Sequence, residues 1–155
     1  MLKIRIVGIG KDKDRWVSDA AEHYVKLLSR WAKLEFDYAT SPKASANLNP
    51  DQIRSAESAL LAEKAAGYTV ALTANARQVD SHAFANLIQK WQTESGGQVT
   101  FVIGGPHGLT PDFVKSASIS LSLSPLTFSH QIVRLVLLEQ LYRGFSILQG
   151  TSYHK

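Results

Sequence analysis

The residues best suited to chemistry form a glycine-rich segment directly after an apolar run. Residues 101–103 (Phe-Val-Ile) lead into residues 104–108 (Gly-Gly-Pro-His-Gly). Ligands of parallel sheets bind beyond the carboxyl ends of the strands, where glycine lets them approach the backbone closely. The spacing G-G-x-x-G is neither the dinucleotide pattern G-x-G-x-x-G nor the phosphate loop G-x-x-x-x-G-K-[ST]. The segment therefore indicates either a ligand loop or a tight turn that needs positive φ.

A second candidate loop covers residues 121–130 (Leu-Ser-Leu-Ser-Pro-Leu-Thr-Phe-Ser-His), where apolar residues alternate with small hydroxyls before a helix. Such a segment can offer backbone amides and carbonyls to an adenine edge while Leu126 covers the face of the ring. The same residues also fit an ordinary strand–loop–helix junction with Ser129 as the helix N-cap. Both interpretations stay open at this point.

A third group of polar residues interrupts an apolar C-terminal helix and continues into the tail. Its members are Arg134, Glu139, Gln140, Tyr142, Arg143, Tyr153, His154 and Lys155. A charge buried without a partner costs several kcal/mol, so Arg and Glu in this helix are either paired or line a site. A purely structural Arg–Glu pair is the alternative, and a C-terminal tail is usually frayed.

The elements that must position these residues follow an α/β pattern, in which apolar runs alternate with helical periodicity. Strands are expected at residues 2–9, 34–39, 68–73, 99–103 and 119–123. Helices are expected at 14–31, 50–66 and 81–94, with another beginning at 110–112 and a last one from about Ser129 or His130 to Ile147. The sequence thus predicts one domain over residues 1–155, with a mainly parallel sheet flanked by helices.

The sequence also predicts a helix cap, a flexible loop and the exposure of several aromatic and histidine side chains. Ser81 is expected to cap its helix, and the loop 40–49, rich in Ser, Asn and Pro, to be the most flexible segment. His23 and His82 are expected to be solvated. The three tryptophans, Trp16, Trp31 and Trp91, are expected in the core.

The last helix carries apolar side chains on nearly every face, which predicts burial on more than one side. A terminal helix in a domain of this size can reach such burial by packing on the sheet and on a second subunit. The sequence therefore favours a homodimer over burial within one chain.

Composition sets wider limits on the partners of the chain. Among 155 residues, 17 Lys and Arg stand against 13 Asp and Glu, a net charge of +4 that suits a polyanion such as RNA. The chain has no cysteine, which excludes disulfides, thiolate nucleophiles and cysteine-based zinc sites. No apolar run approaches the roughly 20 residues of a membrane span, and the N-terminus begins a strand and not a signal peptide. We therefore expect a cytoplasmic protein with no membrane partner and no metal.

Taken together, these residues resemble the ribosomal large-subunit pseudouridine N3-methyltransferase family, a minimal group of SPOUT enzymes, over nearly the whole chain. The resemblance is carried by residues 7–11 (Val-Gly-Ile-Gly-Lys), Tyr24, 101–106 with Gly108, 121–127, 130–134, 139–143 and 153–155 (Tyr-His-Lys).

That resemblance implies a homodimeric fold with a C-terminal trefoil knot, one of the rare exceptions to un-knotted chains. It implies S-adenosyl-L-methionine as the cofactor and 23S rRNA within the ribosome as the substrate, methylated at N3 of a pseudouridine. The cofactor residues would be Leu72, Thr73, Gly104, Gly105, Gly108, Leu123, Ser124, Pro125, Leu126, Thr127, Phe128, Ser129 and His130. Many relatives carry Glu where His107 stands, so no essential role is assigned to that side chain.

The reaction that the resemblance implies suggests a catalytic role for the polar residues of the last helix and the tail. Attack by the weakly acidic N3 imide needs its proton removed or its anion stabilised. His154, whose ordinary pKa suits a base near neutral pH, and Glu139 are both candidates for the base. Arg143 can grip phosphate or stabilise the anion, and Tyr153 can stack on the target base or hydrogen-bond to it.

RNA contacts are expected at Arg134, Lys11 and Lys155. The alternatives are a SPOUT methyltransferase of another RNA target, a non-catalytic ribosome-binding protein, and a generic nucleotide-binding domain.

Overall fold

The computed structural model describes residues 1–42 and 47–155, which form a five-stranded sheet in the order β2-β1-β4-β3-β5. All neighbouring strands in this sheet are parallel. The strands are β1 (Leu2–Ile9), β2 (Ala32–Ala39), β3 (Tyr68–Gln78), β4 (Gln98–Ile103) and β5 (Ile119–Ser122). The helices are α1 (Arg15–Leu28), α3 (Pro50–Lys64), α4 (Ser81–Glu94), α5 (Pro111–Ser116) and α6 (His130–Leu148). The α/β class and the parallel sheet predicted from the sequence are confirmed.

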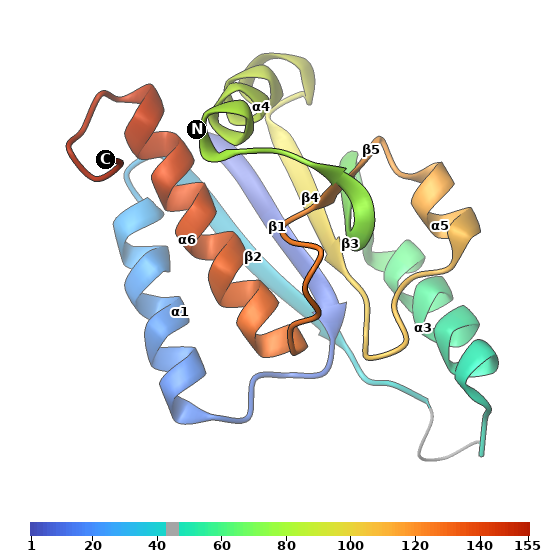
Figure 1. The fold of residues 1–155 in the computed structure, drawn as a ribbon. Coiled ribbons are helices and arrows are strands. Elements are labelled where there is room, and N and C mark those ends of the chain that lie inside the picture. The colour runs from blue at the N-terminus through green and yellow to red at the C-terminus, as the bar shows by residue number, and fades with distance from the viewer. Residues whose placement is uncertain (43–46) are drawn as a thin grey trace.

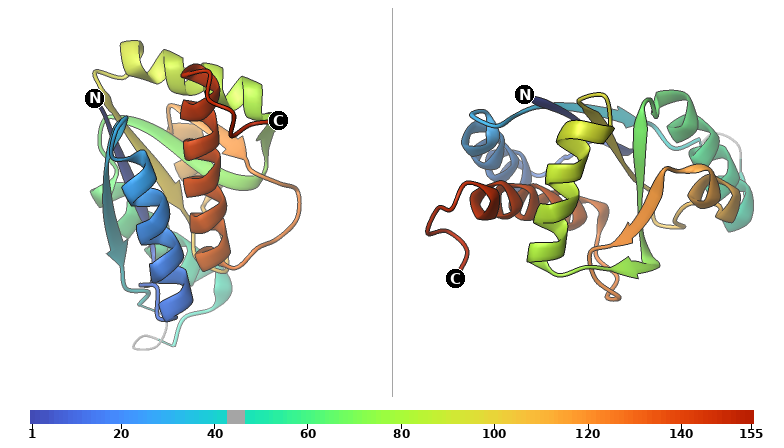
Figure 2. Two further views of the ribbon diagram at one scale, coloured as in Figure 1. Left: turned by 90° about the vertical axis from the view of Figure 1, so that its left-hand side faces the viewer. Right: turned by 90° about the horizontal axis from the view of Figure 1, so that it is seen from above.

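Helices cover both faces of the sheet, with α1, α4 and α6 on one side and α3 and α5 on the other (Figures 1 and 2). Strand β1 shows why, because its side chains alternate between the two faces. Leu2, Ile4 and Ile6 belong to the larger core under α1, α4 and α6. Val7 and Ile9 belong to the smaller core under α3 and α5. Since apolar residues stand at both odd-numbered and even-numbered positions, β1 is a central strand that is covered on both faces.

The carboxyl ends of four strands meet at one edge of the sheet. Gly8 of β1 pairs with Ile103 of β4, which pairs with Leu72 of β3, and Leu72 pairs with Leu121 of β5. Strand β3 runs five residues beyond the expected end at residue 73. A register shift between Leu72 and Arg77 bends it there, so periodicity alone did not reveal the extension.

Helix α6 contacts both α1 and α4 as well as the larger core, and Figure 2 shows it beside α1. Its buried apolar residues are Leu137, Leu138, Leu141 and Phe145, and Phe145 stacks on Trp31 at 5.7 Å. Much of the burial that the sequence suggested for a second subunit is therefore provided within the chain.

Two local expectations are wrong. Asp80, not Ser81, caps α4, because the Asp80 carboxylate accepts from the Ala83 amide at 2.7 Å while Ser81 donates to Gln140. Trp16 is 57% exposed, since the buried residues of α1 are Val17 and Leu28, whereas Trp91 is 1% exposed.

In the loop expected to be flexible, residues 43–46 lie outside the described part of the chain. None of the described helices has the length and apolarity of a membrane span, and the described residues contain no cluster of metal-binding side chains.

Candidate functional site

A cavity of about 640 Å³ lies where the ends of β3 and β4 meet the loop after β5 and the start of α6. Twelve of the thirteen predicted cofactor residues line it, the exception being Pro125. The others that line it are Ala74, Ile103, Pro106, His107, Leu109 and Val133. The fold thus brings together three segments that are far apart in sequence, at the sheet edge where parallel α/β proteins bind ligands.

The glycine loop is both a tight turn and a cavity wall, so the two interpretations of its sequence are compatible. Gly108 has a φ of +76°, and its amide donates to the Gly105 carbonyl at 2.9 Å. A Cβ on Gly104 would lie 2.8 Å from the Gly108 carbonyl carbon, closer than real side chains come. The turn therefore leaves bare backbone facing the cavity.

Behind this loop lies Glu57 of α3, a residue that no motif in the sequence marked. A Cβ on Gly105 would lie 2.7 Å from Glu57 Oε1 and 2.8 Å from Oε2, so the carboxylate takes the space of the missing side chain. Glu57 is 1% exposed. The neighbouring Ser58 accepts a hydrogen bond from the Thr110 amide at 3.0 Å and ties the end of the glycine loop to α3.

The second loop also satisfies both interpretations of its sequence. Ser129 caps α6 by accepting from the Ile132 amide at 3.4 Å, and Ser124 accepts from the Leu126 amide at 3.1 Å. Leu126 is 67% exposed and Phe128 is 37% exposed although both line the cavity. These apolar side chains stand where they can cover a bound ring.

Arg134, predicted to contact RNA, is instead a buried anchor with 1% exposure. Its guanidinium pairs with Asp12 at 2.6 Å, donates to the carbonyls of Ile9 and Gly10, and lies 3.8 Å from the centre of the Tyr38 ring. Burial raises the pKa of Tyr38 to about 12. Because the guanidinium is buried, it has no accessible surface for a phosphate. Its contacts instead tie α6 to the end of β1.

The predicted catalytic residues form one cluster around Glu139. Glu139 Oε1 accepts from Arg143 Nε at 3.1 Å and from the Tyr153 hydroxyl at 2.9 Å. Arg143 lies 4.8 Å from the centre of the Tyr153 ring, and its Nη1 lies 3.3 Å from His154 Nδ1. The tail is therefore held against α6, whereas a frayed tail was the alternative.

Electrostatics within the cluster are set by burial and by Glu139. Burial, followed by hydrogen bonds with Glu139 and Tyr24, raises the pKa of Tyr153. The hydrogen bond with Glu139 raises the pKa of Arg143. A guanidinium only donates, so His154 Nδ1 can act only as the acceptor in this contact. His82, expected to be merely solvated, meets His154 edge-on at 4.8 Å.

The cluster and the cavity lie at opposite ends of α6. His130 at the cavity begins the helix, and the C-terminus lies beyond its other end (Figure 1). At about 1.5 Å per residue, Arg143 is roughly 20 Å from His130 along the helix axis. One copy of the chain therefore does not bring its own tail to its own cavity.

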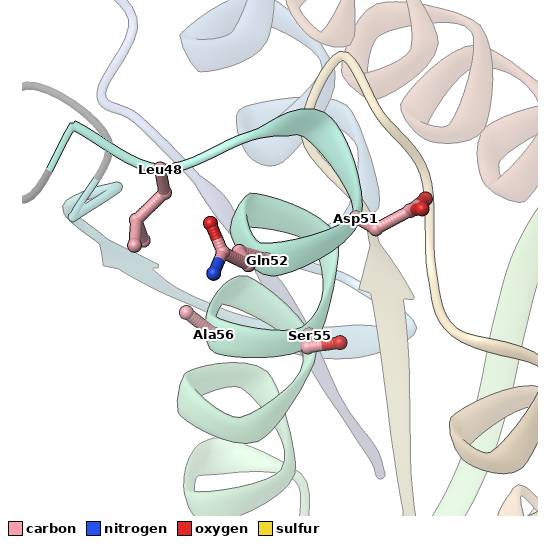
Figure 3. A pocket seen from close by; sticks show the side chains of 5 residues that line it. All are labelled: Leu48, Asp51, Gln52, Ser55 and Ala56. Atoms are coloured by element: carbon pink, nitrogen blue, oxygen red, sulfur yellow. The ribbon is translucent and has the colours of Figure 1, made fainter.

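A second hollow, at the start of α3, offers no comparable chemistry. It is lined by Leu48, Asp51, Gln52, Ser55 and Ala56. Figure 3 shows Asp51 pointing to the other side of the helix from Gln52 and Ala56, and its carboxylate pairs with Arg54 at 2.7 Å. Gln52 forms the capping box with Asn49. These polar groups serve the start of the helix.

Comparison with known proteins decides the family. A family model described as "Predicted SPOUT methyltransferase" matches residues 2–154. The chain belongs to the SPOUT methyltransferase family. This SPOUT methyltransferase is 37% identical over 154 residues to the "Ribosomal RNA large subunit methyltransferase H" of Caldicellulosiruptor saccharolyticus, covering 98% of this chain and 99% of the relative. The protein of the same name from Alkaliphilus oremlandii is 35% identical, over 99% of this chain and 100% of the relative.

Solved structures agree on the fold of this SPOUT methyltransferase. A probable methylase family protein from Haemophilus influenzae matches with a TM-score of 0.55 at 15% identity, over 98% of this chain and 70% of the other. A probable methyltransferase from Bordetella pertussis matches with a TM-score of 0.51 at 14% identity, over 92% and 94%. At these identities the likeness concerns the arrangement of the elements alone.

As a methyltransferase of this family, the chain uses S-adenosyl-L-methionine, and the cavity fits that group. Its volume lies in the usual range for small-molecule sites, about 300–1,000 Å³. The glycine wall offers backbone without side chains, and the loop after β5 supplies the apolar cover that an adenine ring needs. That the lining residues hold the cofactor remains a prediction for each of them.

Four residues near these sites of the SPOUT methyltransferase were not singled out by their sequence pattern. They are Asp12, Tyr38, Glu57 and His82. Their partners Arg134, Gly105 and His154 are between 48 and 122 positions away in the chain, so no local motif could report them. The lysines predicted to contact RNA, Lys11 and Lys155, are both exposed.

Proposed function

We propose that this chain transfers a methyl group from S-adenosyl-L-methionine to N3 of a pseudouridine in the 23S rRNA of the ribosome. The observation that carries the proposal is the convergence of twelve predicted cofactor residues from three separate segments on one cavity. Relatives that match over the full chain and are named as large-subunit rRNA methyltransferases support the choice of substrate.

When bound in the cavity, the cofactor supplies an electrophilic methyl group. The residues that would hold it are Leu72 and Thr73, the glycines of residues 104–108, and the loop 123–130 with Leu126 and Phe128 as cover. The chain's main task is alignment, since methyl transfer needs the base nitrogen within about 3–3.5 Å of the carbon. Closure of the apolar side chains of Leu126 and Phe128 over the bound cofactor would also keep water away from the reacting atoms.

We further propose a homodimer in which the tail of one copy completes the cavity of the other, with the C-terminal segment forming a trefoil knot. The separation of cavity and tail along α6 supports an active site shared between copies, because a gap of roughly 20 Å exceeds the reach of any side chain. In a two-fold dimer both sites would be completed in the same way.

The tail cluster would then act on the target base. Tyr153 and Arg143, both held by Glu139, would position the uracil ring and stabilise negative charge at its carbonyls. Either His154 or Glu139 would accept the N3 proton. His154 could do so through Nδ1 only after Arg143 releases that nitrogen, since a nitrogen that accepts from Arg143 cannot also accept the N3 proton. Lys11 and Lys155, both exposed, would contact phosphate.

The direct test is nucleoside mass spectrometry on rRNA from ribosomes that lack the modification, after incubation with the purified protein and S-adenosyl-L-methionine. A new methylated pseudouridine in 23S rRNA is the expected result. Absence of any methyl gain, despite cofactor binding by calorimetry, would reject this target and move the assignment to another RNA.

The shared site has its own test, by mixing two inactive variants. One variant lacks residues 153–155 and the other carries Gly105→Ala in the cavity wall, and both are assayed at a cofactor concentration at which Gly105→Ala alone gives no product. Random exchange of subunits should place half of the chains in mixed dimers that each hold one intact site, which restores about a quarter of the wild-type activity. Wild-type activity of a monomer, or no recovery on mixing, would exclude a site shared in this way.

A further inference from the structure

Glu57 is a buried carboxylate that the proposed mechanism does not use. Only 1% of the residue is exposed, and neither Oε1 nor Oε2 has a hydrogen-bond partner among the described residues. Glutamate is almost never buried this completely unless it is paired. Its position therefore calls for a functional reason.

The carboxylate directly backs the wall of the cofactor cavity. Its two oxygens lie 2.7 and 2.8 Å from the point where a Cβ of Gly105 would be. Gly105 itself lines the cavity, so only the backbone of the glycine loop separates Glu57 from the bound molecule. Glycine at this position is thus what lets a charge approach the cavity so closely.

No other net charge of the described residues lies against this cavity. Its lining contains no Asp, Glu, Lys or Arg, and its titratable members are His107 and His130. Nearby, Arg134 and Asp12 form an ion pair at 2.6 Å, and their charges cancel. On α3 itself, Arg54 lies one turn before Glu57, and its guanidinium pairs with Asp51 at 2.7 Å, so that pair has no net charge either.

We propose that Glu57 is a specificity-determining residue that favours the methylated cofactor over its demethylated product by charge. The inference rests on the proposed use of S-adenosyl-L-methionine. That molecule carries a sulfonium and an ammonium against one carboxylate, a net charge of +1. S-adenosylhomocysteine has lost the sulfonium charge and is neutral overall, so a buried anion behind Gly105 holds the substrate form and lets the product leave.

The expected size of the effect follows from simple electrostatics. A charge bound in a cavity of about 640 Å³ lies within roughly 10 Å of its wall. At an effective dielectric constant of about 20, two unit charges roughly 10 Å apart attract strongly enough to change binding about tenfold. Neutralising Glu57 should therefore weaken cofactor binding about tenfold and leave product binding within about twofold.

The experiment measures the dissociation constants of both molecules by calorimetry on the full chain. Glu57→Gln keeps the shape and removes the charge, whereas Glu57→Asp keeps the charge and changes the contacts. Glu63→Gln removes an exposed charge from the same helix and is the matched control. Only Glu57→Gln should reduce the preference for S-adenosyl-L-methionine. Sinefungin carries an amine in place of the sulfonium methyl. Its binding should weaken in Glu57→Gln, as the binding of the cofactor does.

Four results would overturn the inference. Equal losses for cofactor and product in Glu57→Gln would mean that Glu57 only shapes the loop. An unchanged preference in that variant would mean that its charge is not felt in the cavity, and the proposed function would still stand. Failure of the wild-type protein to bind either molecule would reject the proposed function along with it. Should Glu57→Gln not fold by circular dichroism, Glu57→Met is the second neutral variant, and retention of the full preference there also refutes the inference.

Discussion

Replacing Arg134 with methionine is expected to destabilise the fold and not to weaken RNA binding directly. The guanidinium is buried, pairs with Asp12 at 2.6 Å and donates to the carbonyls of Ile9 and Gly10. Methionine fills much of the same volume and offers no donor. The variant therefore leaves one carboxylate and two carbonyls at the end of β1 without their partner.

The size of the loss can be worked from these contacts. Removing one member of a buried ion pair costs about 3–5 kcal/mol. The Asp12 side chain keeps 14% exposure, which lets water compensate part of the loss, so the lower end of that range applies. For a chain of this length each kcal/mol shifts Tm by about 2–4 °C, which predicts a fall in Tm of about 6–12 °C.

The assay is thermal unfolding by circular dichroism, with urea unfolding as a second measurement. Lys11→Met, beside Asp12 but exposed, removes the same charge and should change stability by no more than about 0.5 kcal/mol. Combining Arg134→Met with Asp12→Asn should cost less than the sum of the two single changes, because both remove one interaction. A Tm within about 2 °C of wild type, together with a flatter salt dependence of RNA binding, would refute the buried-anchor interpretation and restore Arg134 as a phosphate contact.

Three further predictions follow from the same structure. Deleting residues 153–155 should abolish methylation in the nucleoside assay while Tm and cofactor affinity stay near wild type; a fully active truncation would remove the tail from the mechanism. Gly105→Ala should weaken cofactor binding at least tenfold in calorimetry, because its Cβ would lie 2.7 Å from Glu57, and wild-type affinity would show that the wall yields easily. Tyr38 favours its neutral form in the fold, with a pKa of about 12 against an ordinary value of 10, so the stability that it contributes is present below pH 10 and lost as pH rises towards 12. Tyr38→Phe should remove that part of the alkaline loss in pH-dependent urea unfolding, and an unchanged pH profile would contradict the assignment.

Periodicity and turn chemistry were sufficient to predict most of the fold. The expected first strand coincides with β1 (Leu2–Ile9), and the expected third helix coincides with α4 (Ser81–Glu94). These elements are long and strongly patterned, so local signals agree with the tertiary structure. The extension of β3 to Gln78 was missed because a register shift interrupts the alternation that marks a strand.

Burial of charged residues could not be predicted in the same way. Glu57 looks in sequence like any charged residue on a helix, and Arg134 was expected only to be paired or to line a site, yet both are 1% exposed. What buries Arg134 is a carboxylate 122 positions away, and what makes room for Glu57 is a glycine in another loop. Such pairings are properties of the tertiary structure. A polar residue in an apolar helix therefore predicts a partner or a site, and only the fold distinguishes the two.

Helix α6 connects the predicted cofactor cavity, the end of β1 and the C-terminal tail. Its first residues line the predicted cofactor cavity, Arg134 anchors it to the end of β1, and its last turns hold Arg143 against Glu139 and the tail. Because a helix of this length is rigid, it sets the distance between the predicted cofactor cavity and the predicted catalytic cluster at roughly 20 Å, which one copy cannot close. The same rigidity would make the arrangement accurate in a symmetric pair, since each helix would then present its tail to the other copy's cavity at a set distance. A chain of 155 residues would in this way build a complete active site from two incomplete ones.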